Sequence, residues 1–201
     1  MAFNNFTFPE VLSDLELTLA ETDLFPAVTP FSLNPVFAER LRDSAALARS
    51  VSTEKARSEF IIAPVLLELR FLLGNRFGLF SGVELKAEPK AGLTGICDFL
   101  LTREPLQTVV KTPIVAIVEA KNDSLRSGLG QCIASMVGAQ MLNGNEGETG
   151  RVYGCVTTGS VWQFLHLEHS TVTIDTQEYF LDRVDLILAI FKQIIEGDTT
   201  H

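Results

Sequence analysis

The sequence has few positive charges for a protein that would coat nucleic acid. It contains 16 lysines and arginines against 25 aspartates and glutamates, and its formal net charge is −9. Proteins whose main role is to cover nucleic acid are normally basic, because much of their affinity comes from neutralising phosphates. Any contact with nucleic acid therefore depends on a local basic patch or on metal ions.

Long apolar runs, a secretory leader and a disulfide framework are also missing. No uninterrupted apolar run is long enough to cross a bilayer. The N-terminus has no basic region followed by an apolar stretch, so we expect no signal peptide. Cys97, Cys132 and Cys155 are odd in number and lack the spacing of metal ligands. We therefore expect a cytoplasmic protein without membrane contact, with reduced thiols packed in its core.

Several common catalytic signatures are absent as well. The sequence contains neither a glycine-rich phosphate-binding loop nor a Gly-x-Ser-x-Gly turn, so nucleoside-triphosphatases and α/β-hydrolases have no support. His166 and His169 fall in a predicted hairpin at a spacing that places them on opposite faces, which argues against a shared metal. The remaining candidates are charged residues at the ends of apolar strands.

The apolar pattern predicts one α/β domain with a mixed β-sheet flanked by helices. The predicted helices cover 35–49, 53–73, 122–142 and 182–197. The predicted strands cover 79–87, 95–102, 109–121 with an interruption near Pro113, 152–158, 161–167 and 171–174. Connections between the first three strands are short, which favours antiparallel neighbours. We expect residues 1–50 to form an N-terminal arm and helix that pack on the core or on a partner chain, and residues 51–201 to form one globular unit.

Local signals predict where these helices begin and bend. Asn34 before a proline is typical of a helix N-cap. Ser52 and Thr53 can cap the second helix, and Asp182 is expected to cap the last one. Pro64 lies inside the second helix and predicts a kink or an interruption. Residues 1–35 have no regular pattern and are expected to be irregular.

The most informative run is Pro113–Lys121, which reads Pro-Ile-Val-Ala-Ile-Val-Glu-Ala-Lys. It predicts a buried strand that ends in two opposite charges. Because side chains alternate along a strand, Glu119 and Lys121 lie on the same face. Charges at the end of a core strand are costly to desolvate unless they have a partner or a function.

A second carboxylate is predicted to meet this pair. Asp98 is the only ionised residue in the apolar strand at 95–102, and it precedes Glu119 by one strand-turn-strand unit. Two converging carboxylates repel each other, and Mg²⁺ favours a site of one or two carboxylates completed by water and phosphate oxygens. Lys121 faces the same space, where it could act on a metal-bound water or on a phosphate.

These residues, in this order, resemble the PD-(D/E)xK nuclease superfamily and its restriction-endonuclease-like fold. Asp98 is followed by Glu119-Ala120-Lys121 and then by a helix that carries Gln131. The segment Ser58–Pro64 is similar to the first helix of the nuclease domain at the start of type I restriction subunits. The residue before Asp98 is a cysteine, where the family pattern has proline.

The resemblance implies a role for each residue. Asp98, Glu119 and the backbone carbonyl of Ala120 would bind the metal, and Lys121 would be the catalytic lysine. Glu59 and Gln131 would be supporting residues. The helix face that carries Gln131 is small and polar, since Ser127, Gly128, Ser135 and Gly138 share it.

Other interpretations stay open. The charged residues could form a structural ion pair at a sheet edge, and Gln131 could be an ordinary surface glutamine. Glu54 and Glu68 compete with Glu59, and Glu68 is half a turn out of phase with Glu59 on a regular helix. Glu84 and Glu88 are expected on an exposed strand face.

The predicted function is a nuclease that depends on Mg²⁺, with Mn²⁺ as a substitute, and that hydrolyses phosphodiester bonds of nucleic acid, with DNA preferred to RNA as the expected substrate. The alternative, which the acidic net charge motivates, is a catalytically inactive nuclease-fold protein that binds a partner or ligand. The apolar N-terminal arm and the need to span a duplex further suggest a homodimer.

Overall fold

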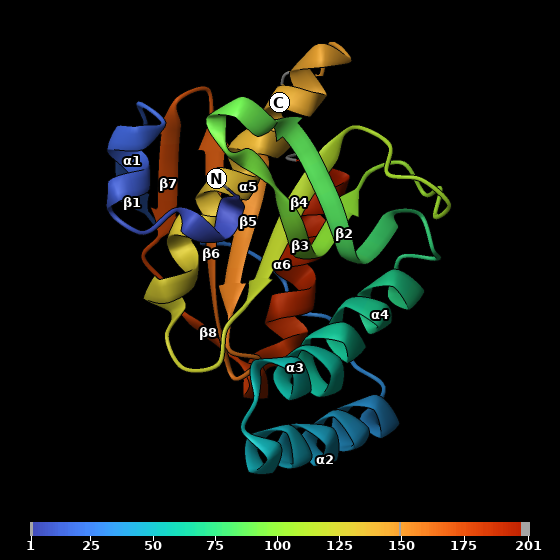
Figure 1. Ribbon diagram of the computed structural model, residues 1–201. Helices are drawn as coiled ribbons and strands as arrows, with labels where there is room; N and C mark the ends of the chain where they lie inside the picture. Colours follow the sequence, from blue (N-terminus) through green and yellow to red (C-terminus); the bar gives the residue numbers. More distant parts are fainter. Residues whose placement is uncertain (1, 149, 198–201) are drawn as a thin grey trace.

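Eight strands form one mixed sheet in the computed structural model, which describes residues 2–148 and 150–197 (Figure 1). The strands are β1 (Thr18–Thr22), β2 (Gly78–Glu88), β3 (Leu93–Thr102), β4 (Ile114–Ala120), β5 (Val152–Thr157), β6 (Val161–Glu168), β7 (Thr171–Asp175) and β8 (Tyr179–Phe180). They follow the order β1-β7-β6-β5-β4-β3-β2, and β8 pairs with β6. The pairs β4–β5 and β1–β7 are parallel and the others are antiparallel. The predicted mixed α/β architecture is confirmed.

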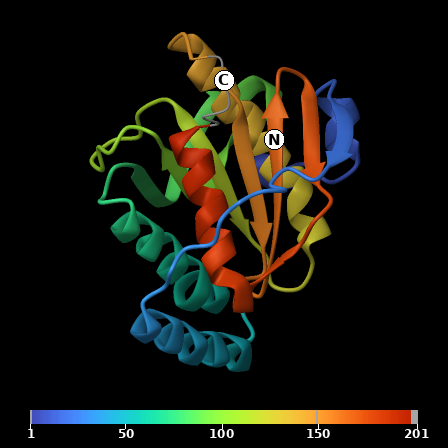
Figure 2. The same ribbon diagram turned by 180° about the vertical axis from the view of Figure 1, so that it is seen from behind.

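Helices cover both faces of this sheet. They are α1 (Glu10–Asp14), α2 (Pro35–Val51), α3 (Glu54–Arg57), α4 (Ala63–Leu72), α5 (Leu125–Asn145) and α6 (Val184–Glu196), with short turns η1 (Phe3–Asn5), η2 (Ser58–Ile62), η3 (Pro89–Ala91) and η4 (Leu181–Arg183). On one face α5, η1 and α1 bury an apolar core, and on the other α2, α4 and α6 bury a second core. Figure 2 shows α6 lying along this second face. No helix within the described ranges is long and apolar enough to cross a membrane.

The central strand β4 is the predicted one, and all seven of its residues are buried. It pairs antiparallel with β3 and parallel with β5, and α5 is the crossover between β4 and β5. Parallel neighbours end at the same edge of a sheet, so the carboxyl ends of β4 and β5 lie together. The strand begins only after Pro113, the position at which the prediction placed an interruption, and the stretch 109–113 before it is irregular.

The N-terminal arm is more regular than the sequence indicates. The prediction that residues 1–35 are irregular is wrong for 10–14, which form α1, and for 18–22, which form β1 and pair with β7. All five residues of β1 are exposed, so no alternation of burial marks it as a strand. Within the arm, Phe3, Phe6 and Val11 are buried against the α5 face of the sheet.

The two helical N-caps at Asn34 and Thr53 are confirmed. The side chain of Asn34 accepts a hydrogen bond from the Val36 N–H at 2.9 Å, and the Thr53 hydroxyl accepts one from the Ala56 N–H at 3.1 Å. The interruption predicted at Pro64 is also present, as the π-helical turn η2 immediately before α4. Proline has no N–H to donate to the preceding turn, which explains why the regular helix changes there.

Two helix ends differ from the prediction. Asp182 does not cap α6, because a 3₁₀ turn comes first and the N-cap position is Arg183, without a side-chain hydrogen bond. Helix α5 continues to Asn145, through residues predicted as loop. Its extension is held by Asn143, whose buried amide accepts from the Ile114 N–H and donates to the Ile114 carbonyl, both at 2.8 Å.

The three cysteines are free and buried, as expected for packed thiols. Burial raises the pKa of Cys97 to about 12, with the nearby Glu119 carboxylate as the next cause. A thiol with such a pKa is almost entirely protonated at neutral pH, which makes it a poor nucleophile.

Candidate active site at the end of the central strand

Asp98 and Glu119 lie opposite each other where β3 and β4 separate. The ladder between these strands ends at the pair Phe99–Val118, although both strands continue beyond it. In the same register the next pair is Asp98 and Glu119. One carboxylate oxygen of Asp98, Oδ2, accepts a hydrogen bond from the Ala120 N–H at 2.8 Å and thereby takes the place of a ladder bond. Asp98 and Glu119 therefore occupy facing positions on neighbouring strands, and the charge of Asp98 acts on Glu119.

Glu119 forms a buried ion pair with Lys121. The lysine Nζ lies 2.7 Å from Glu119 Oε1, and the side chains are 16% and 1% exposed for lysine and glutamate, respectively. The second oxygen, Oε2, is buried and has no hydrogen-bond partner among the described residues. A buried carboxylate oxygen without a partner is energetically unfavourable, so this atom is open to a proton or to a cation.

Helix α5 contacts the side chain of Lys121 and helps to position it. Gln131 Oε1 accepts a hydrogen bond from Lys121 Nζ at 3.4 Å, so the structure brings the predicted glutamine to the cluster. A Cβ atom at Gly128 would lie 2.6 Å from Val156 Cγ1 and 2.9 Å from Lys121 Cγ. The absence of a side chain at Gly128 therefore leaves the space through which the lysine stem passes between helix and sheet.

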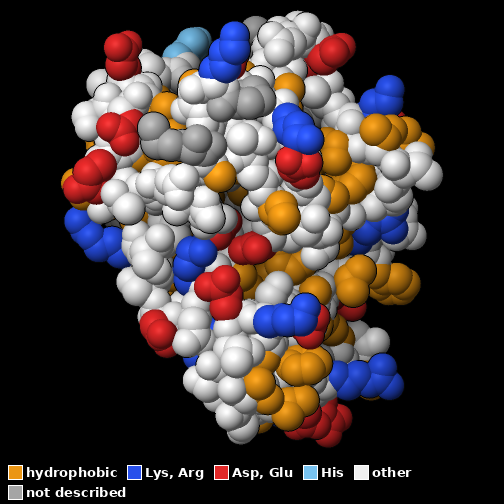
Figure 3. All heavy atoms as spheres, in the orientation of Figure 1, with side chains coloured by type: hydrophobic (Ala, Val, Ile, Leu, Met, Phe, Trp, Pro, Cys, Tyr) orange, Lys and Arg blue, Asp and Glu red, His pale blue; other side chains and the backbone are white. Residues whose placement is uncertain are grey.

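The electrostatics of the cluster favour an additional positive charge. Burial, followed by the neighbouring charge of Asp98, raises the pKa of Glu119 to about 8. Burial alone would lower the pKa of Lys121, but attraction to Glu119, Glu54 and Asp98 raises it overall. Negative charge in excess of the single ammonium group contributes to both shifts, although burial is the largest cause for Glu119. In Figure 3 acidic side chains gather near the middle of the face seen in Figure 1.

The glutamate of α3 whose charge acts on the cluster is Glu54. Its charge acts on both Glu119 and Lys121. Glu59, the predicted supporting residue, is exposed and forms an ion pair with Lys55 at 3.1 Å, so the structure does not bring it to the cluster. The two glutamates are five residues apart, which on a helix separates their directions by about 140°.

Arg57 was not predicted and ties α3 to the sheet. Its Nε donates to Asn122 Oδ1 at 3.2 Å, and its Nη1 donates to the Thr158 carbonyl at 3.0 Å. These acceptors directly follow the carboxyl ends of β4 and β5, so Arg57 holds the helix that carries Glu54 beside the cluster. The only signal in the sequence was an arginine one turn after Glu54, which is too common to indicate a role.

The oxygen atoms present suit a small divalent cation. Asp98 and Glu119 supply two carboxylates, and the carbonyl of Ala120 is directed to the β3 side together with its N–H. The orphaned Oε2 of Glu119 lacks the partner that a metal would provide. Within residues 2–148 and 150–197 no group of three or more His, Cys, Asp and Glu side chains could hold a metal. Two carboxylates and a backbone carbonyl are oxygen ligands of the kind that Mg²⁺ binds, together with several waters.

Comparisons with models of known protein families and with curated proteins find no match. The functional argument therefore depends on the residues of the cluster themselves.

Proposed function

We propose that the protein is a Mg²⁺-dependent nuclease of the PD-(D/E)xK type, with a restriction-endonuclease-like core. The observation that supports this proposal is the pair Asp98 and Glu119 at the point where two central strands separate, with Lys121 Nζ 2.7 Å from Glu119. The order and placement of these groups suit hydrolysis of a phosphodiester bond.

Each residue has a proposed task. Asp98, Glu119 and the Ala120 carbonyl would hold the metal, which would polarise the scissile phosphate and lower the pKa of a water. Lys121 would orient the attacking water or stabilise negative charge on the phosphate through its ammonium group. Gln131 restrains the lysine ammonium through the contact at 3.4 Å. Glu54 adds negative charge that strengthens the attraction for cations.

The substrate class is nucleic acid, and we propose DNA in particular. The test is cleavage of plasmid DNA, single-stranded DNA and RNA with Mg²⁺ or Mn²⁺. Asp98→Asn and Lys121→Ala are expected to lose activity by roughly a hundredfold or more, because each removes a group that acts on the reacting atoms. Glu59→Gln is the matched control and is expected to retain full activity. Wild-type rates in both folded site variants would refute the roles.

One observation favours a second candidate, a nuclease-fold protein that binds a ligand without cutting. Lys121 already neutralises one oxygen of Glu119, and the chain carries a net charge of −9. Calorimetry with Mg²⁺ or Mn²⁺ separates the two functions. Stoichiometric binding that Asp98→Asn abolishes supports the nuclease, whereas a wild-type protein that binds neither ion supports the non-catalytic alternative.

A further inference from the structure

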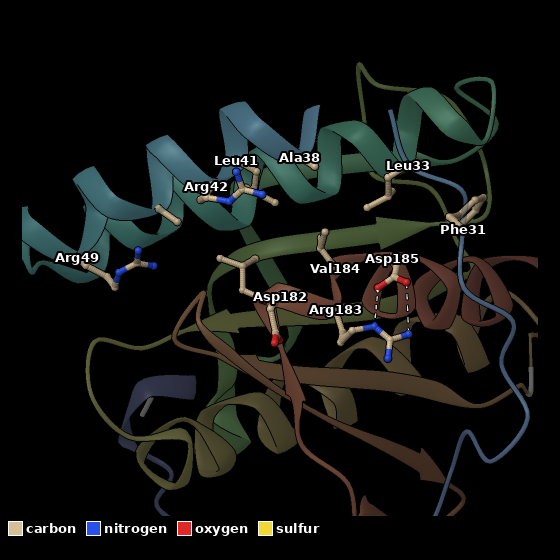
Figure 4. A pocket seen from close by; sticks show the side chains of 12 residues that line it. Phe31, Leu33, Ala38, Leu41, Arg42, Arg49, Asp182, Arg183, Val184 and Asp185 are labelled. Atoms are coloured by element: carbon tan, nitrogen blue, oxygen red, sulfur yellow. Dashed lines mark hydrogen bonds and ion pairs between the residues drawn. The ribbon is translucent and has the colours of Figure 1, made fainter. Parts of the chain in front are cut away.

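A separate cavity of about 500 Å³ lies between α2 and the turn that leads into α6 (Figure 4). Its walls come from two stretches of the chain that are distant in sequence: the linker before α2 together with α2, and η4 together with the first turn of α6. A cavity of this volume is in the range of small-molecule sites. None of the proposed active-site residues lines it.

The floor of the cavity is apolar. Leu41 and Ala45 of α2 and Val184 of α6 are buried there, and the partly buried Phe31 and Leu33 of the linker continue the apolar surface. Such a surface would contact the hydrocarbon or aromatic body of a ligand.

The charges that face the cavity from α2 are positive. Arg42 and Arg49 are two helical turns apart and therefore lie on the same face of α2. No ion pair or hydrogen bond joins either guanidinium to another residue in the described part of the chain. Figure 4 shows the Asp182 carboxylate directed away from α2.

The third arginine of the cavity is already neutralised. Arg183 Nε pairs with Asp185 Oδ1 at 3.1 Å, on the wall opposite α2. The two arginines of α2 are thus the cations left to bind an anion, in a protein whose net charge is strongly negative.

We propose that this cavity binds an organic phosphate with a largely apolar or aromatic body, which is the chemistry of a nucleotide. Arg42 and Arg49 bind the phosphate, because guanidinium groups donate paired hydrogen bonds to phosphate oxygens. The apolar floor holds the base. The phosphate belongs either to a free nucleotide or to a nucleotide of a nucleic-acid strand, and binding here does not depend on the proposed nuclease activity.

The test is calorimetry of AMP binding to the full chain at low salt with EDTA, so that metal and cleavage play no part. Wild type is expected to bind AMP, and adenosine and inorganic phosphate are each expected to bind about tenfold more weakly or worse, because each lacks one half of the ligand. Absence of AMP binding, or equal affinity for AMP and either fragment, overturns the proposal.

The double variant Arg42→Ala with Arg49→Ala is expected to weaken AMP binding by about tenfold or more, through loss of charge-assisted hydrogen bonds. Arg40→Ala is the matched control, since Arg40 is an exposed arginine of α2 that does not line the cavity. Both arginine variants must melt as wild type does, because these side chains are exposed. An equal loss of affinity in Arg40→Ala contradicts the site.

Asp98→Asn separates this proposal from the nuclease. It is expected to bind AMP as wild type does. Loss of AMP binding in the folded variant would indicate that AMP binds at the cluster of Asp98, Glu119 and Lys121 (the strand-end cluster), and would overturn the cavity site. A 5′-phosphorylated oligonucleotide that displaces AMP identifies a nucleic-acid strand as the source of the phosphate, whereas retention of AMP identifies a free nucleotide.

Discussion

The strand-end cluster and the α2 cavity use charge in opposite ways. In the cluster, Asp98, Glu119 and Lys121 lie close together on neighbouring strands, and the glutamate is almost fully buried. In the cavity, Arg42 and Arg49 are exposed and form no ion pair with the described residues, although Asp182 and Asp185 also line the cavity. The first region holds an excess of negative charge where water is largely excluded, and the second holds positive charge in contact with water. Burial strengthens the interactions of the first, and solvent screens those of the second.

The packing of α5 gives the most direct way to disturb the cluster alone. Gly128→Ala is expected to lower the free energy of unfolding by about 1–3 kcal/mol and to reduce nuclease activity, because its Cβ would meet both Val156 and the Lys121 stem. Gly144→Ala is the matched control on the same helix, where a Cβ meets no atom within 4 Å. It is expected to be neutral or slightly stabilising. Chemical denaturation and the cleavage assay measure both effects, and equal behaviour of the two variants would contradict the packing argument.

Glu54 and Glu59 offer a sharper comparison within one helical region. Glu54→Gln is expected to weaken Mg²⁺ binding by about tenfold, since it removes a negative charge that acts on the cluster. Glu59→Gln is expected to leave the affinity unchanged, because it removes only an exposed partner of Lys55. Calorimetry with Mg²⁺ decides between them, and a larger effect at Glu59 would restore the original prediction.

The raised pKa of Glu119 predicts a pH dependence of stability in EDTA. The pKa is about 8 in the folded protein, whereas it is about 4.3 in an unfolded chain. Between these values the folded state holds the additional proton. Its stabilisation is therefore complete below about pH 4.3 and is lost as the pH rises through 8, by about 1.4 kcal/mol per pH unit at most.

The variant Glu119→Gln tests this linkage. Its free energy of unfolding is expected to change less between pH 5 and pH 8 than that of wild type, because the amide does not titrate. Urea denaturation at several pH values measures the difference. Parallel curves for the two proteins would show that Glu119 is not the group responsible.

The smallest expected effects concern how the interactions in the two regions depend on salt. Raising the ionic strength from 50 to 300 mM is expected to weaken AMP binding by about threefold or more, because Arg42 and Arg49 are exposed. The coupling between Glu119 and Lys121, measured by a double-mutant cycle of unfolding, is expected to change by less than about 0.3 kcal/mol. A coupling that decays with salt as AMP binding does would indicate that water reaches the ion pair.

The parts of the molecule that could be predicted from the sequence are those with strong local patterns. The apolar run before Glu119 predicts β4, and alternation along the strand predicts that Glu119 and Lys121 share a face. The short connection between the strand of Asp98 and the strand of Glu119 predicts that these two residues lie on neighbouring strands. The position of Gln131 near the cluster could be predicted because the helix that carries it comes directly after β4. Its contact with Lys121 depends on the space left at Gly128.

The features that could not be predicted depend on the phase of helices or on contacts between distant segments. A π-helical turn interrupts the predicted helix, so the sequence alone could not decide which glutamate faces the cluster. Arg57 acquires its role only when α3 lies beside Asn122 and Thr158. The α2 cavity needs the linker, α2 and η4 together, and no local pattern describes such a meeting.

The pairing of β1 with β7 also has a consequence for the order of folding. Thr18 pairs with Thr171, 153 residues later, so β1 stays without its partner until β7 has been synthesised. Closing so long a loop is entropically unfavourable, and contacts of this kind slow folding. During synthesis the segment around β1 therefore leaves the ribosome early and completes the sheet late.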